Sequence, residues 1–287
     1  MISTGSIAEI QALISQFKSE GKIIGFVPTM GALHQGHLSL VATAKEKVDV
    51  VVCSIYVNPT QFNNQDDLKQ YPRNIAADKD LLEENGCDIL FLPSDEVMYA
   101  GRNTIKFEFG ELDKIMEGKF RPGHFSGVAL IVSKFFNIVL PDFAFFGQKD
   151  LQQLTIIKKL VEELFFNLEI ISVPIKREAH GLAMSSRNER LSNEDREKAK
   201  IFSIALTEAK SILKEKQSAE EAKNKVESLF SNHKAELEYF EIVSDKDLLP
   251  KTENYLAADT VLCIAGFIGN VRLIDNMYMS ESVLSVS

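Results

Sequence analysis

The segment Pro28–Leu38, with the sequence PTMGALHQGHL, holds the residues best suited to chemistry on an anion. His34 and His37 lie three residues apart, between an apolar run at 23–27 and a stretch with helical apolar spacing. We therefore expect a strand that leads into a helix, with His37 in the first helical turn. Unpaired backbone N–H groups and the positive end of the helix dipole meet there. This position favours the binding of phosphate groups.

Two glycines in the same segment, Gly31 and Gly36, would let the backbone approach a ligand closely. The two imidazoles could then donate hydrogen bonds to a chain of phosphates. Two other interpretations stay open at this point: the histidines belong to an ordinary polar loop, or they bind a metal ion at positions i and i+3. A metal site would need a third ligand from His124, His180, His233 or a carboxylate, and no cluster of ligand-type residues accompanies any of these.

The elements that must position these residues alternate between strand and helix. The apolar patterns predict strands at 23–27, 50–57, 88–92, 142–146 and 168–173, with helices that begin at 36 and that cover 74–85, 124–139 and 149–164. Such alternation is typical of βαβ units around a mostly parallel sheet with both faces covered. Ligands of such sheets bind beyond the carboxyl ends of the strands.

Three more polar clusters follow predicted strand ends. They are Asn58–Phe62 after the second strand, Phe146–Asp150 after a later strand, and Met184–Arg187 a loop's length after the last strand. Because the carboxyl ends of parallel strands share one edge of a sheet, we expect these clusters and the histidine segment to line one pocket.

Several residues of these clusters suit a nucleotide. Lys149 follows Gly147 at a strand-to-helix turn, from which its ammonium could reach α- and β-phosphates, although it could also be a solvated surface lysine. Ser185, Ser186 and Arg187 offer two hydroxyls and a guanidinium that suit outer phosphates, although this string alone is more often a loop than a site.

Neutral amides are a second class of candidate. Gln61 lies in the second loop and Gln153 one turn into the helix after Lys149, and amides can orient hydroxyls and carboxylates without adding charge. The segment Arg121–His124 precedes a predicted helix, which it could either cap or equip with an anion site.

The pattern changes near residue 175. A helix capped by Ser192 is predicted to run to about Lys214, a second one from about Ser218 to Asn232, and strands at 237–243, 260–267 and 271–274. The predicted fold class is thus α/β: a Rossmann-like parallel-sheet domain over residues 1–175 and a smaller α+β domain over 176–287 with an antiparallel sheet.

Composition limits the possible functions. The chain has 287 residues with a formal charge of −9, and its 32 Lys and Arg against 41 Asp and Glu argue against nucleic acid as its main partner. Its three cysteines form no C-x-x-C motif and lie in or beside strand-like runs, which indicates reduced core residues. The N-terminus predicts a capped amphipathic helix rather than a signal peptide, and no run is long enough to span a membrane. We expect a soluble, cytoplasmic protein.

Several short motifs of this sequence together resemble the pantothenate synthetase, or pantoate–β-alanine ligase, family. The resemblance rests on strings that occur in order over almost the whole chain: PTMGALHQGHLSL, NPTQF followed by YPR, EG with RPGHF, FGQKDLQQ and GLAMSSRN. H-x-G-H alone would indicate only the broader nucleotidyltransferase superfamily. One residue departs from the family pattern, because His180 stands before Gly181 where the family usually has Asp.

The resemblance implies an ATP-dependent condensation of (R)-pantoate with β-alanine to pantothenate, AMP and pyrophosphate, through a pantoyl adenylate. It implies His37, His34 and Lys149 as catalytic residues, with Gln61 and Gln153 binding pantoate. ATP would be bound by Met30, Gly31, Ala32, Leu33, His34, Gln35, Gly36, His37, Gly147, Gln148, Lys149, Asp150, Lys176, Met184, Ser185, Ser186 and Arg187. It further implies Mg²⁺ on the ATP phosphates, a lid role for 176–287 and a homodimer, with no nucleic acid or membrane as partner.

Two rival functions are kept. One is another H-x-G-H nucleotidyltransferase, such as a cytidylyltransferase or a minimal aminoacyl-tRNA synthetase. The other is a non-catalytic nucleotide-binding module, which would have no need of both histidines, Lys149 and Arg187.

Overall fold

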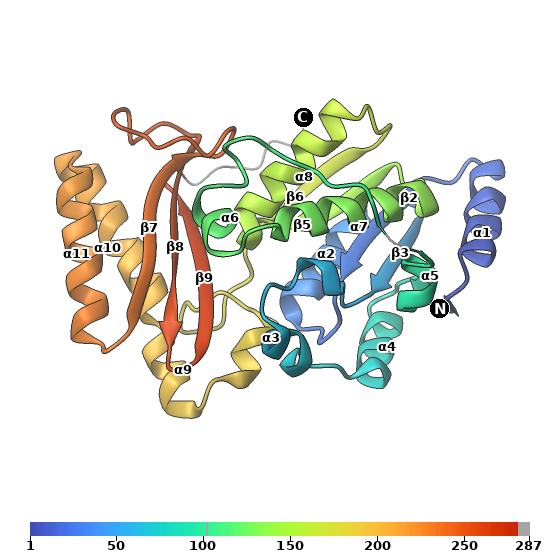
Figure 1. Ribbon diagram of the computed structural model, residues 1–287, viewed down its shortest axis with the longest axis horizontal. Helices are drawn as coiled ribbons and strands as arrows, with labels where there is room; N and C mark the ends of the chain where they lie inside the picture. Colours follow the sequence, from blue (N-terminus) through green and yellow to red (C-terminus); the bar gives the residue numbers. More distant parts are fainter. Residues whose placement is uncertain (102, 281–287) are drawn as a thin grey trace. The chain divides into compact units, whose positions relative to one another are not determined.

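The computed structural model describes residues 1–101 and 103–280 (Figure 1). The chain forms two compact units. Unit 1 comprises Met1–Gln148 and Ile156–Pro174, and unit 2 comprises Lys149–Thr155 and the chain from Ile175 onward. Among the described residues, no helix is long and apolar enough to cross a membrane.

Unit 1 is built on a six-stranded sheet in which every pair of neighbouring strands is parallel. In spatial order the strands are β1 (Ile2–Thr4), β4 (Ile89–Phe91), β3 (Val50–Ile55), β2 (Ile24–Thr29), β5 (Phe143–Gly147) and β6 (Glu169–Val173). The predicted parallel α/β sheet is confirmed. The three-residue edge strand β1 was not predicted, because it is too short to show an alternating pattern.

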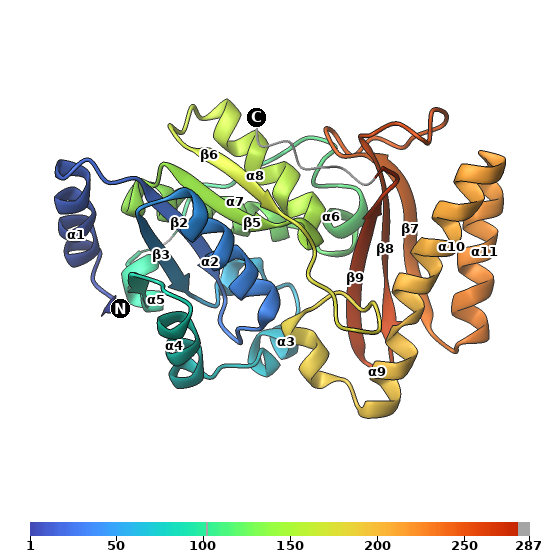
Figure 2. The same cartoon turned by 180° about the vertical axis from the view of Figure 1, so that it is seen from behind.

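Helices cover both faces of this sheet, as the views in Figures 1 and 2 show. Val27 and Leu90 belong to the buried cluster that includes residues of helix α2 (Gln35–Lys47). Their chain neighbours Phe26 and Phe91 instead pack against Phe135 of helix α7 (His124–Val139). Because successive strand residues point to opposite faces, the continuous apolar runs of these strands supply both layers of the core.

The remaining elements of unit 1 connect these layers. The helices α1 (Ile7–Ser19) and α4 (Ile75–Glu84) agree with the predicted helices, and α8 (Leu151–Glu163) begins in unit 2 and ends in unit 1. The sequence did not predict several short helices: η1 (Pro59–Gln61), α3 (Gln65–Gln70), α5 (Asp95–Met98), α6 (Met116–Phe120) and η2 (Gln148–Asp150).

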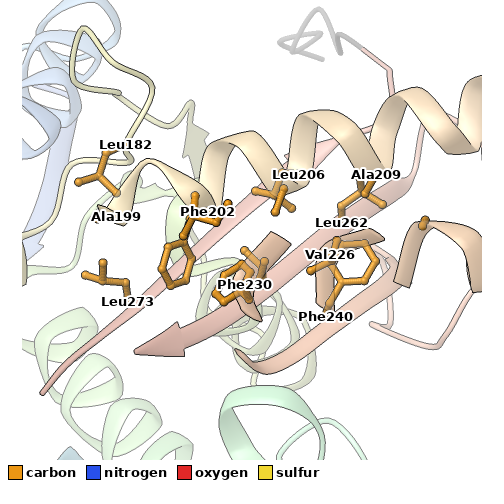
Figure 3. Packing of buried hydrophobic residues seen from close by; sticks show 14 of the residues in the cluster. Leu182, Ala199, Phe202, Leu206, Ala209, Val226, Phe230, Phe240, Leu262 and Leu273 are labelled. Atoms are coloured by element: carbon orange, nitrogen blue, oxygen red, sulfur yellow. The ribbon is translucent and has the colours of Figure 1, made fainter. Parts of the chain in front are cut away.

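Unit 2 contains the predicted antiparallel sheet, with strands β7 (Glu236–Ser244), β8 (Thr260–Ile268) and β9 (Val271–Tyr278) in that order. Its buried core packs side chains of α10 (Ile201–Lys216) and α11 (Ala219–Asn232) on one another and on the sheet (Figure 3). Phe202 and Phe230 meet edge to face at the centre of this core, with ring centroids 5.1 Å apart.

One predicted helix of unit 2 is wrong in its extent. The helix capped by Ser192 does not run to Lys214, because α9 (Asn193–Ala199) ends and α10 begins at Ile201. At the break, the Lys200 N–H bonds to the Glu197 carbonyl three residues back. Ile201 and Phe202, the first two residues of α10 after this break, are buried in the core of unit 2.

Candidate functional site

The histidine segment begins at the point where the strand order of unit 1 reverses. β2 lies between β3, from which the order continues to β4, and β5, from which it continues to β6. In open parallel sheets, ligands bind beyond the strand ends at such a switch point. The loop after β2 and the residues Gly147 and Gln148 at the end of β5 both start there, so unit 1 brings these predicted site residues to one edge of the sheet.

The two histidines cap helix α2 with their own rings. His34 is the N-cap residue and its Nδ1 accepts the Gly36 N–H at 3.1 Å, while His37 Nδ1 accepts the His34 N–H at 3.3 Å. A ring nitrogen that accepts a hydrogen bond carries no proton, so both neutral rings carry theirs on Nε2. The ring centroids are 4.1 Å apart. The fold thus makes two neighbouring N–H donors at the start of a helix, where an anion is favoured.

The loop before these histidines is clamped by a buried carboxylate. Gly31 and Ala32 both have positive φ, at 79° and 50°. The Ala32 and Leu33 N–H groups donate to the two oxygens of Asp78, at 2.9 and 2.8 Å. A Cβ at Gly31 would come within 2.9 Å of the Asp78 carboxylate, so this position requires glycine. Asp78 therefore holds the backbone turn that delivers His34 to α2.

The second loop orients Gln61, which is buried in η1. Asn58 Nδ2 donates to Gln61 Oε1 at 3.0 Å and to the Gly127 carbonyl of α7 at 3.1 Å. Gln61 Nε2 in turn lies 3.3 Å from the sulfur of Met30. Unit 1 thus brings Gln61 beside the first residue of the histidine loop, as expected for a shared site.

Two residues near the start of α7 hold Gln61 by its backbone. His124 Nδ1 lies 2.8 Å from the backbone carbonyl oxygen of Gln61, and the Arg121 guanidinium donates to that oxygen at 3.4 Å. Arg121 also pairs with Glu117 at 3.9 Å. Gly123 of this segment is the N-cap residue of α7, and the side chains of Arg121 and His124 anchor η1, a role that the sequence did not predict. The alternative of an anion site stays a prediction.

Lys149 belongs to unit 2, where its ammonium is mostly buried and lies 3.8 Å from the half-exposed Asp150 carboxylate. Its backbone carbonyl accepts a hydrogen bond from Asn276 of β9 at 2.9 Å. The turn that carries Lys149 is therefore fixed to the sheet of unit 2. Gln153, the second predicted pantoate residue, follows in the first part of α8 and is half-buried.

The predicted C-terminal nucleotide residues lie together on one loop of unit 2. Met184 N–H donates to the Lys176 carbonyl at 3.0 Å, which closes the loop. Ser185 then caps the short helix η3 (Ser186–Arg190), because its hydroxyl accepts the Arg187 N–H at 3.3 Å. Ser186 is buried in the first position of this helix and Arg187 is half-buried.

Two ion networks hold this loop. Arg177 makes a bidentate pair with the buried Asp275 of β9, at 2.7 and 3.0 Å. Burial raises the pKa of the Asp275 carboxyl, and the Arg177 guanidinium counters this effect. Arg177 also donates to the Gly181 carbonyl at 2.9 Å, which links both ends of the loop to the sheet.

Glu178 is the centre of the second network. It accepts hydrogen bonds from Arg196 at 2.8 and 2.9 Å and from Asn188 at 3.0 Å. Burial alone would raise the pKa of Glu178, but these donors together hold it below its ordinary value. His180, the one departure noted in the sequence, places its Nε2 3.1 Å from a Glu178 carboxylate oxygen.

Two residues have orienting roles that the sequence did not predict: Asn58, which the sequence placed only in the cluster Asn58–Phe62, and Asp78, which it did not single out. Asn58 and Asp78 are 1% and 3% exposed and orient Gln61 and the histidine loop. Asp78 lies 46 residues from the N–H group it binds, and nothing in its local sequence marks it.

Neither a disulfide nor a protein-built metal site marks the described parts of the chain. Cys53, Cys87 and Cys263 are buried and none takes part in a disulfide. Within 1–101 and 103–280, no group of three or more His, Cys, Asp or Glu residues could hold a metal ion.

Comparison with known proteins gives a consistent result. The family model for pantoate-beta-alanine ligase matches residues 3–278. Pantothenate synthetases of Bacteroides fragilis and Carboxydothermus hydrogenoformans are 47% and 48% identical over 278 and 276 residues, which cover 96% and 95% of this chain and 98% and 97% of theirs.

Solved structures agree over nearly the whole chain. The crystal structure of pantothenate synthetase from Thermus thermophilus superposes with a TM-score of 0.91 at 38% identity, covering 97% of this chain and 99% of that one. The pantoate-beta-alanine ligase from Francisella tularensis, complexed with beta-gamma ATP and beta-alanine, has a TM-score of 0.80 at 38% identity, covering 97% and 98%.

Proposed function

Because this chain belongs to the pantoate–β-alanine ligase family, we propose here how its residues perform the ATP-dependent ligation of pantoate and β-alanine. In the first step a pantoate carboxylate oxygen attacks the α-phosphorus of ATP, and pyrophosphate leaves. In the second step the β-alanine amine attacks the acyl carbon of the pantoyl adenylate and AMP leaves. The first step gains most from groups that stabilise charge on the phosphoryl oxygens and on pyrophosphate.

In unit 1 we assign His34 and His37 to this charge. The observation that carries the assignment is that both Nδ1 atoms accept backbone N–H groups, so that both Nε2 atoms are donors. His37, in the first turn of α2, is the hydrogen-bond donor or general acid nearest the leaving pyrophosphate. The segment Met30–Gly36, whose turn Asp78 holds, lines the unit 1 part of the nucleotide site.

In unit 2 we assign Lys149 to the α- and β-phosphates, and Ser185, Ser186 and Arg187 to the β- and γ-phosphates. Gly147, Gln148 and Asp150 shape the nucleotide site around Lys149. Backbone groups at Lys176 and Met184 contact adenine. This assignment is supported by the way the two ion networks and the Asn276 hydrogen bond hold these segments on the sheet of unit 2.

Gln61 and Gln153 are assigned to pantoate. Gln61 Oε1 already accepts a hydrogen bond from Asn58, so Nε2 is the atom of this side chain that donates to a substrate oxygen. Pantoate offers carboxylate and hydroxyl oxygens that accept such a donor.

Four further features belong to this proposal. Mg²⁺ enters with ATP, because it usually keeps water ligands and binds through substrate phosphates. The enzyme works in the cytoplasm, in agreement with three buried cysteines that take part in no disulfide. Residues 176–287 act as a lid over an intermediate that water would hydrolyse, and residues 1–175 bind ATP and pantoate. The working form is a homodimer.

The experiment that tests the scheme is isotope exchange. With ATP, Mg²⁺ and pantoate but no β-alanine, the enzyme should exchange labelled pyrophosphate into ATP, because the amine enters only after adenylation. Addition of β-alanine should yield AMP rather than ADP. Exchange that requires β-alanine would overturn the two-step order, and exchange driven by an amino acid in place of pantoate would favour an aminoacyl-tRNA synthetase.

A further inference from the structure

A tyrosine outside every motif of the family resemblance is hydrogen-bonded to the amide that orients Gln61. Tyr99 follows α5, and its hydroxyl donates to Asn58 Oδ1 at 2.6 Å. The Thr60 hydroxyl donates to the same oxygen at 3.0 Å. Asn58 is 1% exposed, so its hydrogen bonds are made inside the protein. A hydroxyl can donate or accept, but the Thr60 backbone N–H can only donate, and it also points to this atom at 3.4 Å, which identifies the atom as the amide oxygen.

The other side of Asn58 meets only acceptors. Its Nδ2 donates to the Gly127 carbonyl and to Gln61 Oε1. A backbone carbonyl cannot donate, so the Asn58 nitrogen has to face it. The chain of donors and acceptors runs in one direction, from the Tyr99 hydroxyl through Asn58 to Gln61. Gln61, at the end of this chain, must accept through Oε1. Its Nε2 therefore points toward Met30, 3.3 Å from the sulfur.

Tyr99 is itself fixed by a cation. The Lys134 ammonium of α7 lies 4.0 Å from the centroid of the Tyr99 ring and also donates to the Met98 carbonyl and to Asn103 Oδ1. A cation over a tyrosine face is attracted by the ring's electron density. Since α7 also supplies the Gly127 carbonyl, one helix fixes both ends of the path from Tyr99 to Asn58.

We propose that Tyr99 is a positioning residue for pantoate, which acts through Asn58 to keep the nitrogen of the Gln61 amide directed at the substrate. This inference rests on the assignment of Gln61 to pantoate made above. A Gln61 amide turned by 180° would present an oxygen to a carboxylate, which repels it, instead of an N–H that binds it. Tyr99 thus reinforces the orientation of Asn58, and through it the orientation of Gln61 that binds an acceptor oxygen.

Tyr99→Phe tests the proposal, because it removes the hydroxyl and keeps the ring beneath Lys134. The KM for pantoate should rise about 3- to 10-fold, as expected for one lost hydrogen bond, with a smaller change in kcat and none in the KM for ATP. Tyr56→Phe is the matched control. Its hydroxyl donates to Asp95 at 2.7 Å rather than to Asn58, so its loss should lower thermal stability and leave the KM for pantoate unchanged.

A double variant separates this proposal from the assignment on which it rests. Gln61→Ala alone should raise the KM for pantoate, and a normal KM would overturn the assignment of Gln61 and with it the role of Tyr99. If Gln61→Ala raises the KM, Tyr99→Phe added to it should have no further effect, because the two changes act on one interaction. Additive effects, or a Tyr99→Phe enzyme that matches Tyr56→Phe, would overturn the role of Tyr99 while the pantoate assignment stands.

Discussion

The carboxylate of Asp78 provides the sharpest test of how the fold positions the two histidines. Asp78→Asn keeps the shape of the side chain but replaces one acceptor oxygen by a donor. One of the two N–H groups, of Ala32 or Leu33, then loses its partner, although Asp78 and both loop residues are buried. A buried donor without a partner costs about 1–3 kcal/mol, so the free energy of unfolding should fall by that amount.

The effect on catalysis follows from the loop conformation. Ala32 holds a φ of 50°, which an alanine adopts only under constraint, and the Asp78 hydrogen bond supplies that constraint. When it weakens, His34 and His37 move with the loop. A displacement near 1 Å can cost about 10²-fold in rate, so pantoate-dependent pyrophosphate exchange should fall by roughly 10- to 10²-fold.

The matched control is Asp80→Asn, which changes the charge of α4 equally but at an exposed position. Urea unfolding gives the stability and the isotope assay gives the rate. If the Asp78 and Asp80 variants have equal stabilities and exchange rates, the clamp does not position the histidines and the reasoning fails.

Three further predictions concern other parts of the site. His37→Ala removes one donor aimed at the developing charge and should lower kcat by ~10²–10³-fold in a folded enzyme, measured by steady-state kinetics with circular dichroism as the fold control; near-normal turnover would show that the ring only caps α2. Gly127→Ala would place a Cβ 2.5 Å from the Thr60 carbonyl oxygen and should therefore displace η1. The free energy of unfolding in urea should fall by about 1–3 kcal/mol, and the KM for pantoate should rise. An unchanged KM would contradict the close packing of η1 on α7. Glu178→Gln should lower the melting temperature at neutral pH, and because the folded-state pKa of Glu178 is lowered, its stabilisation is present above its unfolded pKa and lost as pH falls through the folded value; a difference in melting temperature that persists undiminished in acid would argue against the network.

The longer elements of unit 1 were predictable because its central strands are mostly apolar runs and its long helices carry apolar stripes. The core strands Val50–Ile55 and Phe143–Gly147 are buried over most of their length, which the sequence shows directly. The break at Lys200 was not predictable in the same way. Residues on both sides of it have helical propensity, and no Pro or Gly in the sequence marks the point where α9 ends and α10 starts.

The residues of the candidate site fall into two similar groups: those that short sequence motifs predict and those that only the tertiary structure brings together. Residues proposed to meet a ligand directly, such as His34 and Lys149, stand in short motifs whose composition indicates their chemistry. The groups that orient them come from distant segments, as Tyr99 and Asn58 do across 41 residues. A hydrogen bond between such segments depends on tertiary structure, and one sequence has no local pattern that records it.

The capping arrangement of the histidines has a consequence for the chemistry. Each Nδ1 accepts a backbone N–H, so protonation of the ring at that nitrogen would break a hydrogen bond that stabilises the start of α2. With Nδ1 used as an acceptor, Nε2 is the ring atom from which each histidine donates. In the proposed mechanism these donors stabilise the charge that develops as pyrophosphate leaves, and the start of α2 determines their direction. Lys149 is proposed to supply the positive charge beside them.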